Sequence, residues 1–161
     1  MEKDKLRVII IDDDGLTTRN NIFRRYYQCE ADRLGLKLII QFHTSFPYLS
    51  ELILADIISW DNDLGVEGET IRHLRRLQYI ADNEDFTNSL KDKIHIIHSM
   101  NNVASHALFE LFTHDIGAKA YLIPFTHMKD LVEQLDHKQY KPATIYINVD
   151  VGGNDVQGNQ I

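Results

Sequence analysis

Acidic side chains directly follow two of the most apolar segments of the sequence. The stretch ISWDNDLG places Asp61 and Asp63 after an apolar run, and the stretch RVIIIDDD places Asp12 and Asp13 in the same way. Neighbouring carboxylates repel each other, and burying one without a partner would cost several kcal/mol or force it to protonate. Carboxylate and water oxygens are the ligands that Mg²⁺ and Mn²⁺ prefer. The pattern predicts a Mg²⁺ site, with Mn²⁺ as a substitute, in which Asp61 is a ligand together with Asp12 or Asp13.

A structural role for the same acids is the alternative. Asp commonly follows strands, forms turns and caps helices, and Asp14 before Gly15 fits a capping role. One cap does not require three adjacent acids and two more after another strand. A metal site is therefore the favoured interpretation, and a structural or vestigial cluster is the alternative.

Two side chains could move protons beside such a metal. His98 ends the apolar run IHIIH, where a neutral imidazole could act as a general acid or base near pH 7. Asp63 could be an outer group of the metal site or a base. The alternative for His98 is a core residue that bonds to a backbone carbonyl, and we expect His95 to be an ordinary residue within the strand. Asp63 and His98 are the candidate catalytic residues.

The elements that must position these groups alternate along the chain. Apolar, β-branched runs predict strands at residues 7–12, 37–42, 56–60, 93–98 and 119–123. Helical patterns occupy residues 20–34, 47–54, 67–81, 103–113 and 127–135, and residues 86–92 are a polar insertion or a helix extension. Such alternation predicts an α/β fold with a doubly wound, five-stranded parallel sheet. Parallel sheets bind ligands beyond the carboxyl ends of their strands, so the acids and His98 should converge on one edge.

The end of the chain departs from this alternation. Residues 142–150, PATIYINVD, alternate apolar and polar side chains, which predicts a further edge strand. We therefore expect a domain over residues 1–137 and an extension of strand and tail over 138–161. An interaction arm is the alternative for the extension.

Composition limits the classes of partner. The net charge of −7 argues against binding nucleic acid through a generally basic surface, although it leaves room for a local basic patch. No apolar run approaches the length of a membrane span, so we expect no membrane partner. Cys29 is the single cysteine, which excludes an internal disulfide and a thiolate zinc cluster. A reducing, cytoplasmic setting is the prediction.

Two short basic clusters lie on predicted helices. They are FRRYY, with Arg24 and Arg25, and RHLRR, with Arg75 and Arg76. A solvated face with salt bridges is the simpler interpretation. The functional one is a docking surface for a protein partner or for an RNA backbone, because Arg and Tyr are common at binding hot spots and can stack on bases.

The order of elements and the motif IDDD resemble the receiver domains of response regulators. The resemblance implies a flavodoxin- or receiver-like sheet of order 2-1-3-4-5 and a Mg²⁺ held by Asp12, Asp13 and Asp61, with Asp61 accepting a phosphoryl group. Ser99 fills the place of the Ser or Thr that receivers carry after the fourth strand. Where receivers carry a Lys–Pro pair after the fifth strand, this chain reads Ile123 and Pro124. The Lys that would contact the phosphoryl group is absent.

A narrower resemblance rests on two motifs. WDNDLG and IIHSMNNVA are similar to the DHDLG and HSxNPxG motifs of receiver-like domains proposed to process cyclic phosphates. The resemblance implies that Ser99 and Asn101 bind phosphate. The chain departs from those motifs at Asn62, Asn102 and Ala104, which replace His, Pro and Gly.

These observations lead to two functional hypotheses. The favoured one is a receiver-like binding or regulatory protein that acts on a larger machine of transcription or RNA processing through a helix face or the tail. Its acidic site would then be degenerate or vestigial. The alternative is a metal-dependent phosphoesterase that processes 2′,3′-cyclic phosphate RNA ends or a related phosphoester. One fold hosts many functions, so the resemblance does not choose between them.

Overall fold

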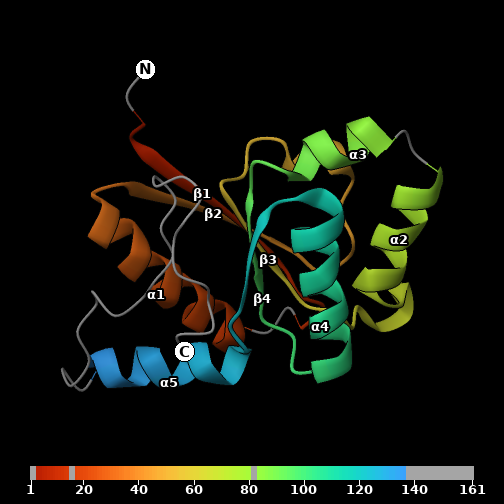
Figure 1. The fold of residues 1–161 in the computed structure, drawn as a ribbon. Coiled ribbons are helices and arrows are strands. Elements are labelled where there is room, and N and C mark those ends of the chain that lie inside the picture. Colours follow the sequence, from red (N-terminus) through yellow and green to blue (C-terminus); the bar gives the residue numbers. More distant parts are fainter. Residues whose placement is uncertain (1–2, 15–16, 81–82, 137–161) are drawn as a thin grey trace.

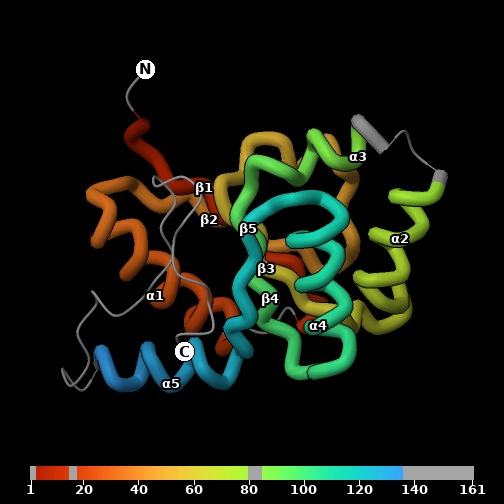
Figure 2. Tube along the Cα trace, viewed as in Figure 1, coloured from red at the N-terminus to blue at the C-terminus, as the bar shows by residue number. Residues whose placement is uncertain are grey.

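A single parallel sheet forms the centre of the protein. The computed structural model describes residues 3–14, 17–80 and 83–136. Its strands are β1 (Lys5–Ile11), β2 (Lys37–His43), β3 (Ile57–Trp60), β4 (Ile94–Ile97) and β5 (Lys119–Leu122). They lie in the order β2-β1-β3-β4-β5 and every neighbouring pair is parallel (Figures 1 and 2). The predicted fold class and strand order are confirmed.

Helices cover both faces of the sheet. On one face lie α1 (Thr17–Leu34) and α5 (Phe125–Asp136), and on the other lie α2 (Thr70–Ile80), α3 (Asn83–Leu90) and α4 (Asn102–Glu110) (Figure 1). A π-helical turn, η3 (Leu111–Ile116), extends α4. Two 3₁₀ turns complete the set: η1 (Leu49–Leu52) between β2 and β3, and η2 (Gly65–Glu67) ahead of α2. Among the described helices, none is long and apolar enough to cross a bilayer.

Several element boundaries differ from the sequence prediction, among them three between β2 and β4. The helix expected over residues 47–54 is only the single turn η1, which closes when Tyr48 and Glu51 bond to each other through backbone and side chain. The segment 86–92 belongs mostly to a separate helix, α3. The helix expected from Glu67 begins at Thr70, because Asn62 bonds to the first backbone amides of α2. The predicted strand at 142–150 and the extension over 138–161 lie outside the described residues.

Alternation along the central strand divides the core into two layers. Val8 and Ile10 of β1 face the layer beneath α1 and α5, whereas Ile9 and Ile11 face the layer beneath α2, α3 and α4. The apolar strand patterns predict that Val8, Ile10, Ile58, Ile97 and Leu122 form the spine of the sheet, and the first four are fully buried. Leu122 is only half-buried because β5 is an edge strand. The sheet is thus packed on both faces, and its carboxyl edge carries the polar side chains.

Candidate functional site

Backbone hydrogen bonds hold the two acidic segments at the same edge of the sheet. The amide of Asp12 donates to the carbonyl of His43 at 3.0 Å, and the amide of Asp61 donates to the carbonyl of Ile11 at 2.8 Å. Each Asp is the first residue after its strand, so the ladder extends one residue beyond the strand ends. The backbone at both positions is therefore fixed by the sheet.

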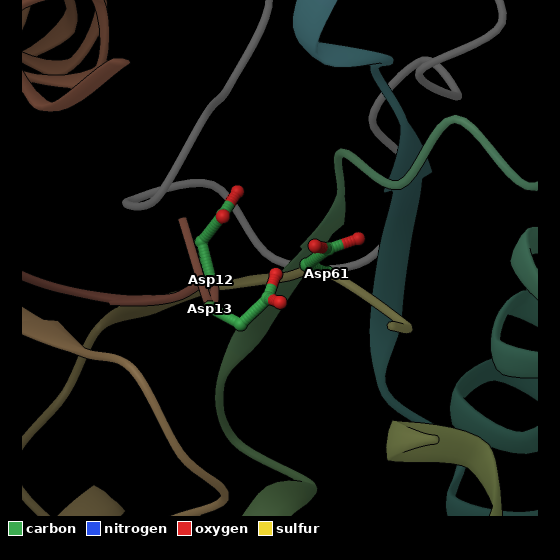
Figure 3. A group of neighbouring side chains, drawn as sticks. All are labelled: Asp12, Asp13 and Asp61. Atoms are coloured by element: carbon green, nitrogen blue, oxygen red, sulfur yellow. The ribbon is translucent and has the colours of Figure 1, made fainter. Parts of the chain in front are cut away.

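The carboxylates of Asp12, Asp13 and Asp61 converge at this edge (Figure 3). One oxygen from each side chain lies within 4.8 Å of the others. Asp12 is buried, Asp61 is half-buried and Asp13 is exposed, so a group bound between them would be open to solvent on one side. The three side chains lie close together, as expected from their positions directly after two strands of a parallel sheet. Their role as metal ligands stays a prediction.

Two of these carboxyls hold their protons more tightly than usual. Burial, together with the charges of Asp12 and Asp13, raises the pKa of Asp61 to about 6, although His98 and the amide of Asn62 oppose the shift. Burial and the charge of Asp12 also raise the pKa of Asp13. A cation placed between the carboxylates would favour their charged forms and so would lower the pKa of both groups.

Asp12 behaves in the opposite way and stays ionised. Burial by itself would raise its pKa, but the bonds from His98, Arg19 and the amide of Asp14 outweigh burial and lower it. The three donors lie at 2.9 Å, 2.7 Å and 2.9 Å from the carboxylate oxygens. Asp12 is therefore the permanent negative charge of the cluster.

His98 lies behind Asp12, within the protein. Its side chain is fully buried, its Nε2 is 2.9 Å from Oδ2 of Asp12, and its Nδ1 is 2.8 Å from Oγ of Ser59. An ionised carboxylate only accepts hydrogen bonds, so Nε2 carries a proton and donates it. A proton could pass between His98 and a bound group only through Asp12. The catalytic role of His98 stays a prediction, and its geometry is that of a group that orients Asp12.

A depression of about 260 Å³ opens over the three carboxylates. Asp63, Ser99 and Asn101 also line it, together with Arg19. The depression therefore combines acidic side chains with groups that can bind an oxyanion: a guanidinium, a hydroxyl and an amide.

Arg19 was missed by the sequence analysis. Its guanidinium donates to Asp12, lies 3.8 Å from a carboxylate oxygen of Asp14, and stacks over the ring of Phe125 at 3.9 Å from the centroid. The position depends on packing between α1 and α5, which no local motif encodes. The one sequence signal is indirect: the Lys expected at Ile123 is missing, so any cation at this edge must come from another element.

Ser99 and Asn101 have structural bonds in addition to their place in the depression. The hydroxyl of Ser99 accepts from the amide of Asn101 at 3.2 Å, and the side chain of Asn101 accepts from the amide of Ala104 at 3.1 Å, which caps α4. The phosphate-binding role predicted for both stays a prediction. A ligand on either residue would also contact the start of α4.

The segment after β3 explains the ending of ISWDNDLG. Asn62 is buried, and its side-chain amide donates to Glu69 at 3.1 Å, so its role is to organise the loop. Asp63 is exposed and lines the depression. Gly65 has φ of +61°, and a Cβ at that position would lie 3.2 Å from Oδ2 of Asp13. Any larger residue would be strained there by the positive φ and would press on the Asp13 carboxylate.

The strand order is that of flavodoxins and receivers. The fold is receiver- or flavodoxin-like. No protein-family model matches the chain, and no curated protein matches it in sequence.

Among solved structures, a short-chain flavodoxin associated with a bacterial microcompartment is 12% identical, with a TM-score of 0.46 over 84% of this chain and 99% of that one. A CheY-like receiver domain from Methanospirillum hungatei is 21% identical, with a TM-score of 0.42 over 84% and 94%. A flavone reductase is 14% identical, with a TM-score of 0.47 over 84% and 66%. At TM-scores below 0.5, none of the three supports a conclusion about this protein.

The two basic clusters lie on opposite faces of this fold. Arg24 and Arg25 are exposed on α1, and Arg75 and Arg76 are exposed on α2 (Figure 1). Arg24 lies over the ring of Phe42, 4.9 Å from the centroid. A single flat partner could not cover both clusters at once. Partner binding through either one stays a prediction.

Proposed function

We propose that this protein is a receiver-like regulatory binding module whose acidic edge binds Mg²⁺. The observation that carries the proposal is the convergence of Asp12, Asp13 and Asp61, whose oxygens lie within 4.8 Å of one another. The donor set is all carboxylate, which suits Mg²⁺ or Mn²⁺ and disfavours softer metals. Asp12 supplies a charge that persists at low pH, and Asp61 and Asp13 supply charges that a cation would stabilise.

The surroundings of the cluster favour an oxyanion as the second ligand. Three carboxylates carry more negative charge than one divalent cation neutralises, so an anion would need a further positive charge. Arg19 supplies that charge at the same depression. Ser99 and Asn101 offer hydrogen-bond donors beside it. A phosphoryl group bound to the cation would contact the residue that caps α4, so occupancy would alter the start of that helix. This coupling is the regulatory element of the proposal.

Such a module would act through a docking surface that binds a larger machine of transcription or RNA processing. The exposed Arg pairs on α1 and α2 are the candidate docking residues. Charge reversal at Arg24 and Arg25 should abolish capture of the partner if α1 docks, and reversal at Arg75 and Arg76 should do so if α2 docks. Melting temperature should hardly change, because exposed charges contribute little to stability. Unchanged capture by both double variants would redirect the search to residues 138–161.

A phosphoesterase activity is the second candidate, and the position of Asp63 favours it. This exposed carboxylate shares the depression with the cluster, where it could activate water beside a bound phosphate. The assay is incubation of a short RNA ending in a 2′,3′-cyclic phosphate with Mg²⁺ or Mn²⁺. Product that Asp63→Asn abolishes would support an enzyme, whereas no turnover with either metal would leave the binding role.

Thermal melting with and without metal tests the main proposal. Mg²⁺ should raise the melting temperature of the wild type by mass action, because only the folded edge assembles the ligands. Asp61→Asn should melt higher than the wild type without metal, since repulsion is relieved, and should lose the response to metal. Asp130→Asn, an exposed acid on α5, is the matched control and should keep the response. A wild type that shows no shift with Mg²⁺ or Mn²⁺ would overturn the proposal.

A further inference from the structure

The outer edge of β2 is the longer of the two edges of the sheet. β2 pairs with β1 over seven residues, whereas β5, at the other edge, pairs with β4 over four. Among the described residues, no strand lies beyond β2. A long edge strand without proline offers a row of backbone groups to any other strand, and natural proteins usually cover such an edge. β2 is therefore the strand at which a further partner is expected.

The side chains of β2 indicate what kind of strand would fit beside it. Leu38, Ile40 and Phe42 pack against the layer beneath α1 and α5, but they are only partly buried there. On the opposite face of the strand, Lys37 and Gln41 are exposed. A neighbouring strand should alternate in the same way, with apolar side chains on the α1 side and polar ones on the other.

Residues 142–150, PATIYINVD, have this alternation. In a strand, Ile145, Ile147 and Val149 would share one face, and Tyr146 and Asn148 would share the other. Three apolar side chains at every second position are also what β2 presents on its α1 side. The segment therefore matches the edge in length and in pattern.

The end of α5 determines the direction in which such a strand would run. The helix begins after the carboxyl end of β5 and has 12 residues, so it extends about 18 Å back along the sheet. Residues 137–141, which lead to the segment, can span at most about 17 Å. They could not return along α5 and also cross to the sheet. A strand that begins at Pro142 therefore begins near the amino ends of the other strands and runs parallel to them.

The hand of the crossover then selects the edge. Connections between parallel strands of one sheet are right-handed, and the hand depends on the face that is crossed and on the direction of travel. The connection from β1 to β2 crosses through α1, and α5 lies beside α1 on the same face (Figure 1). A right-handed crossover through α5 must therefore travel in the direction from β1 towards β2. The described strands fill the sheet as far as β2, so the free place is beyond it.

We propose that residues 142–150 pair with the outer edge of β2 of the same chain as a sixth, parallel strand, with Ile147 beside Ile40. Tyr146 would then lie beside Ile39. A hollow of about 150 Å³, which Ile39 and Gln41 help to line, leaves room for the tyrosine ring on that side. The segment would close the edge of β2 to strand addition by a second copy or by an extended peptide.

Paired cysteines test the choice of edge in the full chain. In a Cys29→Ser background, Ile40→Cys combined with Ile147→Cys should be linked by a short bifunctional thiol reagent in most molecules, because neighbouring strands lie about 4.8 Å apart. The control combines Ile147→Cys with Leu122→Cys, a half-buried residue of the other edge strand, and should remain unlinked. Intact mass distinguishes a link within one molecule from a link between two. The proposal is overturned if the first pair does not link, if both pairs link alike, or if the links join two molecules.

Hydrogen exchange provides a second test that leaves the described residues unchanged. Ile147→Pro removes a backbone donor from the proposed ladder, so exchange of the β2 amides that point away from β1 should become faster by about tenfold or more. Gln157→Pro, outside the segment, is the matched control and should leave exchange as in the wild type. Equal exchange in wild type and Ile147→Pro would overturn the proposal. Protection of β2 that falls on dilution of the wild type would also overturn it, because the partner strand would then come from a second copy.

Discussion

The imidazole Nε2 of His98 lies 2.9 Å from Oδ2 of Asp12, although 86 residues separate the two in sequence. The bond is buried, and the second ring nitrogen is held by Ser59. Asp12 therefore has its orientation set from within the protein, before any ligand arrives. A carboxylate fixed in this way loses little freedom when it binds a cation, which favours affinity.

Replacement of His98 should weaken cation binding, although its side chain does not line the depression. His98→Ala should reduce the affinity for Mg²⁺ by roughly 10- to 100-fold, because Asp12 loses the donor that orients it. It should also lower the free energy of unfolding by about 2–4 kcal/mol through the lost bond and the cavity. Isothermal titration with Mg²⁺ and urea denaturation measure the two effects.

A conservative variant separates orientation from packing. The amide of His98→Gln can still donate to Asp12, so this variant should recover part of the Mg²⁺ affinity that His98→Ala loses. Equal affinity in both variants and in the wild type would show that Asp12 is not held for a cation.

Two glycines provide a test of how closely the chain approaches the cluster. Gly65 and Gly35 both have positive φ, +61° and +70°, but only at Gly65 would a Cβ meet a neighbour, Oδ2 of Asp13. Both Gly→Ala changes should cost about 1 kcal/mol in unfolding free energy for the backbone conformation. Gly65→Ala should in addition displace Asp13 and reduce the melting-temperature shift with Mg²⁺, and Gly35→Ala should not. Identical metal responses would show that Asp13 is not a ligand.

The acidic edge could be predicted from sequence because its geometry follows from strand ends. Parallel strands that end together place the next residue of each at one edge, and Asp12 and Asp61 are those residues. The glycine that ends ISWDNDLG is typical of a turn, but the closeness of Gly65 to Asp13 depends on how the loop returns over the edge. Local sequence patterns indicate where a strand ends, but they do not indicate how a loop returns over the edge of the sheet.

The positions of Arg19 and of Phe46 show the limit of sequence reasoning in another way. Arg19 reaches the depression because α1 and α5 pack side by side and Phe125 supports its guanidinium. The stacking of Phe46 on His73 likewise joins a loop to a helix that is distant in sequence. Both features are tertiary contacts between residue types that are common on surfaces, so neither stands out in the sequence.

A buried acid on α1 should make stability fall as pH rises. Burial raises the pKa of Glu30 to about 7, against a value of 4.5 in the unfolded chain, although Arg33 opposes the shift. Between these two values the folded state binds more protons than the unfolded state, so raising the pH through this window destabilises the protein, by about 1–3 kcal/mol in all. Glu30→Gln should thus stabilise the protein at pH 8 and change little at pH 4.5. Urea denaturation across this pH range measures the difference, and a constant difference at every pH would contradict the assignment.

A buried imidazole should have the opposite effect at lower pH. His95 is fully buried, receives a bond from Nε1 of Trp60 at 3.0 Å, lies 2.8 Å from the carbonyl of Leu90, and stacks on Phe112 at 4.1 Å. Nδ1 is thus the acceptor and Nε2 the donor, which defines a neutral ring. Burial lowers the pKa of His95 to about 4 from 6.5.

This neutral ring predicts a loss of stability as pH falls from 6.5 towards 4. In that window the unfolded chain binds the proton and the folded protein does not, so acid favours unfolding by up to about 3 kcal/mol. His95→Gln keeps an acceptor and a donor but cannot titrate, so it should be less stable than the wild type at pH 7 and the gap should narrow as the pH falls. His106→Gln, which replaces an exposed histidine on α4, is the control variant over the same range. Urea denaturation of the three proteins at each pH provides the comparison. A difference in unfolding free energy between wild type and His95→Gln that stays constant from pH 7 to 4 would contradict a ring that stays neutral in the folded protein. The bonds of the ring to Trp60 and Leu90 would then not fix its protonation state.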